Sequence, residues 1–175
     1  MSAEDLWVFG YGSLMWRPGF AYLSRHKARV TGWTRRLCVF SQVYRGTPER
    51  PGLVLGLDAG GSCEGVVFRV SADRREETLK YLRDRELVTN VYLETTAEAK
   101  FDEGGEVRTV TYVADRHHVQ YTPPMPRGRL LAIISGSAGQ SGPNAEYVLN
   151  THDHLVELGI ADEELSWLAA RLRGE

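Results

Sequence analysis

A large excess of charge of one sign is absent from this chain. Its 175 residues include 21 basic and 23 acidic side chains, which gives a net charge of −2 with histidine neutral. A protein that binds nucleic acid or an anionic membrane through its electrostatic field normally presents a strong excess of basic side chains. We therefore expect neither nucleic acid nor a membrane as a partner.

Long apolar runs and the pattern of a signal peptide are also missing. No apolar run approaches the roughly 20 residues that a membrane-spanning helix needs. The first residues, Met-Ser-Ala-Glu-Asp, are acidic and lack the basic and apolar regions of a signal peptide. The hydrophobic content of 42% and the charged content of 25% are typical of a globular protein. We expect one domain over residues 1–175, located in the cytoplasm.

Cysteine is scarce, and the histidines lack the spacing of metal ligands. Cys38 and Cys63 both lie in strand-like runs. In a cytoplasmic protein two reduced thiols are expected, with a disulfide between them as the alternative. His152 and His154 are two residues apart on an expected helix, so they face different sides. The ligand patterns of a metal site are absent, and we expect no metal.

Strand patterns come early in the chain, and helical patterns gather late. After an opening apolar run, the expected strands are Arg29–Phe40, Leu53–Leu57, Cys63–Val70, Val91–Ala97 and Glu106–Val113. Glycine content predicts a hairpin turn at Asp58–Ser62, and glycine with proline predicts a loop at Arg45–Gly52. The expected helices are Asp73–Glu86, Leu130–Ile134, Pro143–Leu158 and Asp162–Leu172. Strands first and helices late favour an α+β fold.

A glycine-rich step near the start, Trp7-Val-Phe-Gly-Tyr-Gly-Ser-Leu-Met-Trp16, has two interpretations. A dinucleotide-binding turn would need its third glycine at Met15, and Ser13 does not lie in a Gly-x-Ser-x-Gly elbow. A plain turn is one interpretation. The bulky residues on both sides favour another, a backbone loop that directs N–H groups at a small anion in a pocket. These residues are Trp7, Phe9, Leu14 and Trp16. The later stretch Ser135–Gly142 lacks the Lys-Ser/Thr pair of a phosphate loop, and we expect a turn there.

The helix expected at Asp73–Glu86 carries a carboxylate on its apolar face. Counting about 100° per residue from Leu79 places Leu82 at about 300° and Glu86 at about 340°. Glu86 therefore projects between two leucines that should face the core. Burial and the negative end of the helix dipole both raise the pKa of a carboxyl group. A raised pKa suits a general base that works near neutral pH.

The ends of the same helix carry further expectations. Asp73 is the candidate N-cap, and Glu76 is its capping-box partner. At the other end, the alternatives to a buried base are that the helix frays before Glu86, or that Arg83 or Arg85 pairs with Glu86 at the surface.

Five stretches together resemble the ChaC-like family of gamma-glutamylcyclotransferases. They are "VFGYGSLMWRPGF" at 8–20, "YRGTPERPG" at 44–52, "EGVVFRV" at 64–70, "YLRDREL" at 81–87 and "GQSGPNAEYVLN" at 139–150. The resemblance covers nearly the whole chain in the right order. It implies a small mixed β-barrel with flanking helices, and the cleavage of glutathione to 5-oxoproline and cysteinylglycine without metal or organic cofactor.

The resemblance also implies roles for single residues. Glu86 is the expected catalytic base, Tyr11–Leu14 form the expected substrate-binding loop, and Tyr147 matches a family position near the substrate. The loop candidates are Phe9, Gly10, Tyr11, Gly12, Ser13 and Leu14. Arg45 is a further candidate from its Pro- and Gly-rich loop, with an exposed loop charge as the alternative. We expect a monomer or weak dimer that binds glutathione or a related gamma-glutamyl peptide.

The expected reaction explains why these residue types are needed. In a gamma-glutamyl amide the α-amine can reach its own δ-carbonyl and close a five-membered lactam, so the protein need not supply a nucleophile. A base must remove a proton from the amine, and backbone N–H groups can hold a carboxylate or an oxyanion. A cyclotransferase for other gamma-glutamyl amines, or a non-catalytic regulator of cation transport, are the alternatives.

Overall fold

The computed structural model describes residues 4–87 and 90–174. The chain divides into two compact units. Unit 1 comprises Met1–Arg36 and Gly56–His118, and unit 2 comprises Leu37–Leu55 and Val119–Glu175. The two units are described in turn, and a single domain over the whole chain stays a prediction.

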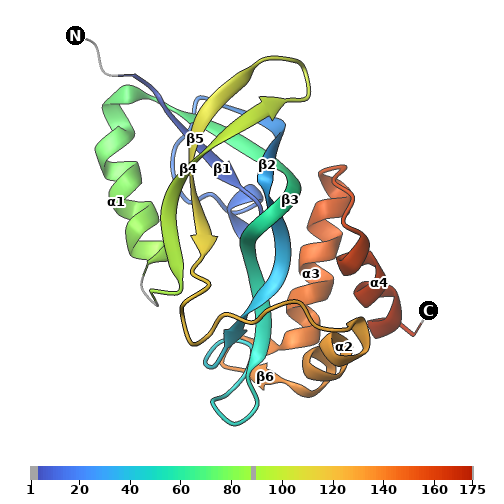
Figure 1. Cartoon of the computed structure of the whole chain (residues 1–175). Coiled ribbons are helices and arrows are strands. Elements are labelled where there is room, and N and C mark those ends of the chain that lie inside the picture. The colour runs from blue at the N-terminus through green and yellow to red at the C-terminus, as the bar shows by residue number, and fades with distance from the viewer. Residues whose placement is uncertain (1–3, 88–89, 175) are drawn as a thin grey trace. The chain divides into compact units, whose positions relative to one another are not determined.

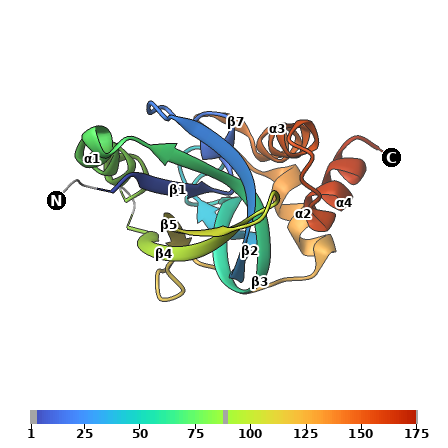
Figure 2. The same cartoon turned by 90° about the horizontal axis from the view of Figure 1, so that it is seen from above.

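Unit 1 contains most of the barrel (Figures 1 and 2). The barrel strands are β1 (Leu6–Gly10), β2 (Ser24–Ser41), β3 (Gly52–Val70), β4 (Tyr92–Phe101) and β5 (Glu106–Ala114). The end of β2 and the start of β3 belong to unit 2. The strands close in the order β1-β3-β2-β4-β5. β1 pairs antiparallel with β3 and parallel with β5 through Val8 and Val110, so the barrel is mixed. The expected α+β class and the mixed barrel are confirmed.

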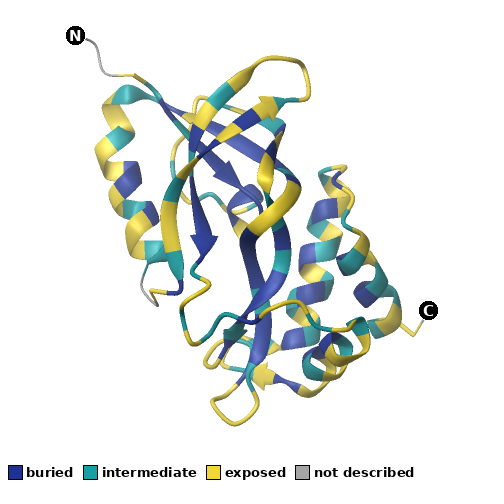
Figure 3. Cartoon of the chain, in the orientation of Figure 1, coloured by how far each residue is buried: buried dark blue, intermediate teal, exposed yellow. Residues whose placement is uncertain are grey.

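Alternating apolar residues of the strands fill the core of unit 1. Phe9, Phe68 and Tyr112 are among its largest fully buried side chains. In Figure 3, β1 and β5 are drawn mostly as buried. A fully buried large apolar side chain contributes about 1.5–3 kcal/mol to stability. The barrel is therefore a firm frame for the segments that leave its strands.

The hairpin expected around Asp58–Ser62 is wrong, because Gly52–Val70 is one continuous strand. Gly60 and Gly61 have φ angles of +104° and +66°, a conformation that glycine adopts easily. Here it kinks the strand as a bulge does, without reversing the chain. Glycine content alone did not distinguish a bend within a long barrel strand from a turn between two short ones.

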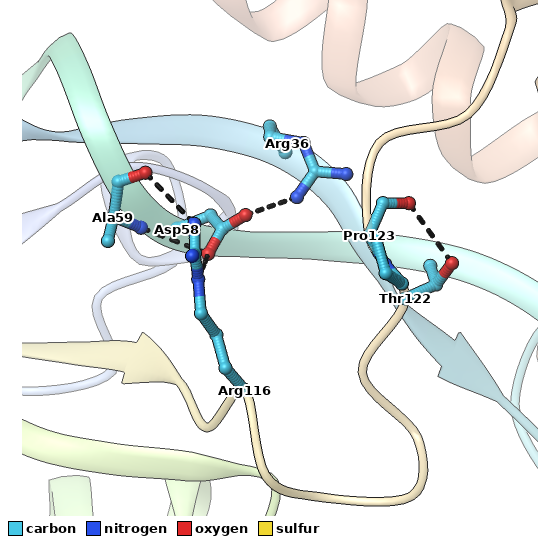
Figure 4. A network of polar contacts seen from close by, with 6 residues as sticks. All are labelled: Arg36, Asp58, Ala59, Arg116, Thr122 and Pro123. Carbon is cyan, nitrogen blue, oxygen red and sulfur yellow. Dashed lines mark hydrogen bonds and ion pairs between the residues drawn. The ribbon is translucent and has the colours of Figure 1, made fainter.

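An ion network around the buried Asp58 lies at this bend (Figure 4). The side chain of Asp58 is only 2% exposed, and its carboxylate contacts the guanidinium groups of Arg36 and Arg116. Arg116 Nε donates to Asp58 Oδ1 at 2.7 Å, and Arg116 Nη2 donates to the carbonyl of Ala59 at 3.2 Å. The segment that follows β5 is thereby tied to the middle of β3.

The main helix of unit 1 is α1 (Arg75–Glu86), which a short 3-10 turn at Ala72–Arg74 precedes. The expected capping by Asp73 and Glu76 is wrong, because no side chain caps either segment from its N-cap position. Instead Asp5 accepts a hydrogen bond from the Ala72 N–H at 3.0 Å. A partner 67 residues away in the sequence satisfies the donor that a local cap would otherwise take.

Unit 2 contains a packed group of helices, α2 (Arg127–Gly136), α3 (Asn144–Glu157) and α4 (Glu163–Leu172), which lie side by side in Figures 1 and 2. The helices expected in this region are confirmed. Asp162 caps α4 by accepting from the Leu165 N–H at 3.0 Å, and Gly159, with φ of +71°, follows the end of α3. The turn expected at Ser135–Gly142 is present only in its later part, because α2 continues through Gly136 and the two-residue strands β6 (Ala138–Gly139) and β7 (Gly142–Pro143) follow it.

Two further expectations concern cysteine and membrane spans. Cys38 and Cys63 are both reduced thiols, and both are buried. Within residues 4–87 and 90–174, no helix has the length and hydropathy to cross a membrane.

Candidate active site

The glycine-rich loop leaves the end of β1 in unit 1. Phe9 is fully buried, and its carbonyl accepts a hydrogen bond from Thr111 Oγ1 at 3.0 Å. Ser13–Met15 then form a single 3-10 turn, closed by the Met15 N–H donating to the Gly12 carbonyl at 2.9 Å. The strand followed by a tight turn is as expected. The loop is thus held by the barrel at its start and by its own hydrogen bonds beyond.

Glycine is required for close packing at the root of the loop. Gly12 has a φ of −132°, so it does not adopt the left-handed conformation. At Gly10 an added Cβ would lie 3.0 Å from Leu14 Cβ. On the neighbouring strand, a Cβ on Gly65 would lie 2.3 Å from the Gly10 carbonyl oxygen. The backbone at the root of the loop therefore leaves no room for side chains at these positions.

The bulky residues around the loop do not all serve as its wall. Tyr11 and Leu14 are buried with Phe9. The ring of Trp7 instead contacts Phe101, at 5.8 Å between centroids, and lies under the guanidinium of Arg69.

A buried arginine that sequence reasoning missed holds the loop from within unit 1. The Nε of Arg35 donates to the carbonyl of Tyr11 at 2.7 Å, and Nη2 donates to the carbonyl of Glu64 at 2.5 Å. Arg35 is 9% exposed. The signal available in the sequence was its period-2 spacing from Leu37 in an apolar strand. The positive charge of Arg35 lies beneath the loop and favours the binding of an anion there.

Glu86 is the last residue of α1, and the helix does not fray before it. Leu79 and Leu82 are buried as expected, and the side chain of Glu86 is 19% exposed. Burial raises the pKa of the Glu86 carboxyl, and the charge of Arg85 lowers it by a smaller amount. The structure therefore contains a largely desolvated carboxylate at the negative end of a helix dipole.

Arg85 connects this carboxylate to the loop. Its Nε lies 3.6 Å from Glu86 Oε1, and its Nη2 donates to Ser13 Oγ at 3.0 Å. Its Nη1 donates to the carbonyls of Arg17 and Pro18, at 2.7 and 3.2 Å. The structure thus brings Ser13 and Glu86 together through one guanidinium. The side chains of Arg85 and Glu86 are 21% and 19% exposed, so their ion pair is not the surface pair considered as an alternative.

Arg83 has a different partner. It binds Glu94 of β4 with two hydrogen bonds, at 2.9 and 3.1 Å, and these lower the pKa of Glu94. The hydroxyl of Tyr112 also donates to Glu94, at 2.8 Å. The pKa of Tyr112 is raised far above its ordinary value, mainly by burial and to a smaller extent by this hydrogen bond. Tyr112 also interacts electrostatically with Glu86, so Tyr112 belongs to the surroundings of the candidate base.

Arg45 and Tyr147 lie in unit 2, where the structure brings them together. The Arg45 guanidinium lies 5.7 Å from the centre of the Tyr147 ring, and its Nη1 donates to the Pro143 carbonyl at 3.1 Å. The Tyr147 hydroxyl accepts a hydrogen bond from the Leu55 N–H at 3.0 Å. Both side chains are partly buried, so Arg45 is not simply an exposed loop charge.

The loop and the hairpin that carry these two residues fit closely within unit 2. An added Cβ on Gly139 would lie 2.4 Å from the Val43 carbonyl oxygen, and one on Gly46 would lie 2.1 Å from the Gly52 nitrogen. Asn144 is fully buried and exchanges two hydrogen bonds with the backbone of Leu53, each at 2.9 Å. Two of the sequence stretches that carry the family resemblance therefore pack on each other.

No cluster of three or more His, Cys, Asp or Glu side chains in the described part of the chain could hold a metal ion. The imidazole of His152 instead lies 3.3 Å from Ser166 Oγ and 3.5 Å from Arg173 Nη1.

Comparison with known proteins gives one family. The family model described as ChaC-like protein matches residues 6–174. The chain is 32% identical, over 168 residues, to the glutathione-specific gamma-glutamylcyclotransferase of Escherichia coli (strain K12), covering 96% of this chain and 73% of that protein. It is 35% identical to the Homo sapiens glutathione-specific gamma-glutamylcyclotransferase 1, covering 93% and 76%. A crystal structure of a yeast gamma-glutamyl cyclotransferase specific to glutathione has the same fold, with a TM-score of 0.84 at 22% identity over 97% of this chain and 96% of that one.

Proposed function

The chain belongs to the ChaC-like family, and we propose that it is a glutathione-specific gamma-glutamylcyclotransferase with Glu86 as its general base. Relatives named for this activity align over most of the chain at 32% and 35% identity. The observation that carries the proposal is the largely buried carboxylate of Glu86, joined through Arg85 to the glycine-rich loop. A binding module without catalysis has no need for such a base.

The proposed reaction is an intramolecular aminolysis. The α-amine nitrogen of the gamma-glutamyl group attacks the δ-carbonyl carbon and forms the new C–N bond of the lactam. The bond between that carbon and the cysteine nitrogen breaks. Glu86 takes a proton from the attacking nitrogen and returns it to the departing amine, so the products are 5-oxoproline and cysteinylglycine.

The loop supplies the remaining chemistry in this proposal. Its backbone N–H groups hold the α-carboxylate of the substrate or the oxyanion that forms on the carbonyl. Phe9 and Gly10 fix the root of the loop, and Tyr11–Leu14 contact the substrate. The charge of Arg35 behind Tyr11 favours an anion at this place. Holding the glutamyl group folded for attack supplies much of the rate.

Arg45 and Tyr147 stay proposed substrate contacts within unit 2. Their pairing supports the proposal, because a guanidinium kept over an aromatic ring is preorganised for a carboxylate. We also propose that the protein works in the cytoplasm as a monomer or weak dimer. No cofactor is part of the proposed reaction.

The test is to incubate the purified protein with glutathione and to measure 5-oxoproline and cysteinylglycine by mass spectrometry. N-acetyl-glutathione is the matched control, because its acetylated nitrogen is neither basic nor nucleophilic. The proposal expects turnover of the first and none of the second. Release of 5-oxoproline from gamma-glutamylalanine but not from glutathione would overturn the assignment to glutathione and leave the lactam mechanism standing. No release from either gamma-glutamyl compound would refute the enzyme.

A further inference from the structure

Arg85 occupies a position that the proposed reaction does not use directly. Its side chain is 21% exposed, and its guanidinium contacts α1, the glycine-rich loop and the residues that follow that loop. An arginine on a free helix surface would extend into water, as the exposed Lys80 on the same helix does. The burial of Arg85 therefore calls for an explanation.

We propose that Arg85 is a positioning residue with two roles, fixing the shape of the loop from Ser13 to Pro18 and placing a positive charge beside the Glu86 carboxylate. The inference rests on the proposed function of Glu86 as the base. It concerns how this base and the substrate-binding loop are kept in a common arrangement.

The first role follows from the hydrogen bonds of the guanidinium. One nitrogen serves the side chain of Ser13, and another serves the carbonyls of Arg17 and Pro18. Nη1 also lies 3.2 Å from the hydroxyl of Tyr81, which is one turn earlier on α1. A planar group with five fixed donors can serve several acceptors at once, whereas the ammonium of a lysine is a compact point charge. Arginine is therefore specifically suited to this place.

The loop is also shaped to accept this clamp. Gly19, with φ of +75°, brings the chain over Tyr81, and an added Cβ there would lie only 2.0 Å from the Tyr81 hydroxyl oxygen. The ring of Phe20 packs edge-on against Tyr81, at 6.4 Å between centroids. The segment after the loop is thus seated on the same turn of α1 from which Arg85 extends.

The second role follows from the charges around Glu86. On α1 the facing charge is Arg85, and from β5 the facing group is Tyr112. Tyr112 is bonded to Glu94 of β4, whose charge Arg83 neutralises. Arg85 is therefore the cation that stabilises the Glu86 carboxylate, and it opposes the effect of burial on that group. Without this charge, Glu86 would stay protonated to higher pH and would be inactive as a base over that range.

Two substitutions separate these roles. Arg85→Lys keeps the charge and loses the planar fork, so we expect KM for glutathione to rise by about tenfold, with the acid limb of the kcat/KM profile unmoved. Arg85→Met loses both, so KM rises and the acid limb moves to higher pH. The substrate amine titrates equally in every variant, so differences between the profiles report the enzyme. Lys80→Met is the control, because it removes an exposed cation of the same helix and should change neither.

Hydrogen exchange of the backbone amides of residues 13–17 provides a readout that does not require turnover. Exchange there should be faster in both Arg85 variants than in wild type and unchanged in Lys80→Met. An active wild type whose Arg85→Met variant keeps the KM and the acid limb would overturn the inference and leave the proposed function intact. A wild type inactive on glutathione refutes the proposed function, and unchanged exchange in Arg85→Met and Arg85→Lys refutes the clamp independently.

Discussion

Replacing Glu86 by glutamine should abolish turnover and make the protein more stable. The amide has nearly the same size and shape but cannot accept a proton. General base catalysis typically contributes 10²–10⁴-fold, so the activation barrier should rise by about 2.7–5.4 kcal/mol, at 1.36 kcal/mol per tenfold in kcat. The stability gain arises because the carboxylate is largely desolvated, with a side chain only 19% exposed.

The sign of the stability change follows from the pKa of Glu86. Burial raises this pKa above the 4.5 of an ordinary glutamate, and Arg85 offsets it only in part. Between the unfolded and the folded pKa, the native state binds more protons, so stability falls as pH rises through that window. The destabilisation caused by the ionised Glu86 carboxylate is complete above the folded pKa and absent below pH 4.5. Glu86→Gln should therefore be more stable than wild type at pH 7–8, and this difference should vanish in acid.

Thermal melts between pH 4 and 8, paired with 5-oxoproline assays, provide the measurement. Each kcal/mol gained in the free energy of unfolding should raise Tm by roughly 2–4 °C for a chain of this size. Glu77→Gln is the matched control, because Glu77 lies on the same helix with a side chain 66% exposed and should be nearly silent in both assays. If Glu86→Gln melted at or below the wild-type temperature at pH 8, the desolvated-base reasoning would be wrong. Wild-type turnover in the variant would refute the catalytic role.

Three further predictions concern other parts of the chain. Gly12→Ala should lower activity more than stability, because the added methyl group obstructs the approach of the substrate to the backbone. Unchanged affinity for a gamma-glutamyl ligand would show that the loop is only a structural turn. Tyr147→Phe should lower the free energy of unfolding in urea by about 1 kcal/mol, since the Leu55 N–H loses its acceptor. Both Tyr147→Phe and Arg45→Ala should raise KM more for glutathione than for gamma-glutamylalanine. Asp58→Asn should cost about 3 kcal/mol in urea unfolding, because two arginines lose a buried partner; a loss below about 0.5 kcal/mol would contradict this.

Local patterns in the sequence were sufficient for much of this structure. The strands at Val91–Ala97 and Glu106–Val113 and the helix from Asp162 each depend on neighbours in sequence, and all are present. The partial burial of Glu86 followed from the spacing of Leu79 and Leu82. The roles of Glu86 and the loop residues remain predictions.

What could not be predicted depends on partners far apart in the chain. Asp5 satisfies Ala72 across 67 residues, and Arg85 reaches Ser13 across 72. A strand that bends at Gly60 has the same local composition as a hairpin. The sequence did not indicate a role for Arg35, because an arginine within a strand normally faces water. The closed barrel places two backbone carbonyls where they accept hydrogen bonds from its guanidinium.

The burial of both cysteines has a consequence for a protein whose proposed substrate is a thiol. Thiol–disulfide exchange requires a thiolate to reach the sulfur of the other molecule. Cys38 is 0% exposed and Cys63 is 3% exposed, so neither sulfur is accessible to oxidised glutathione in the folded state. Thiol–disulfide exchange with oxidised glutathione should therefore not modify the folded protein at either cysteine.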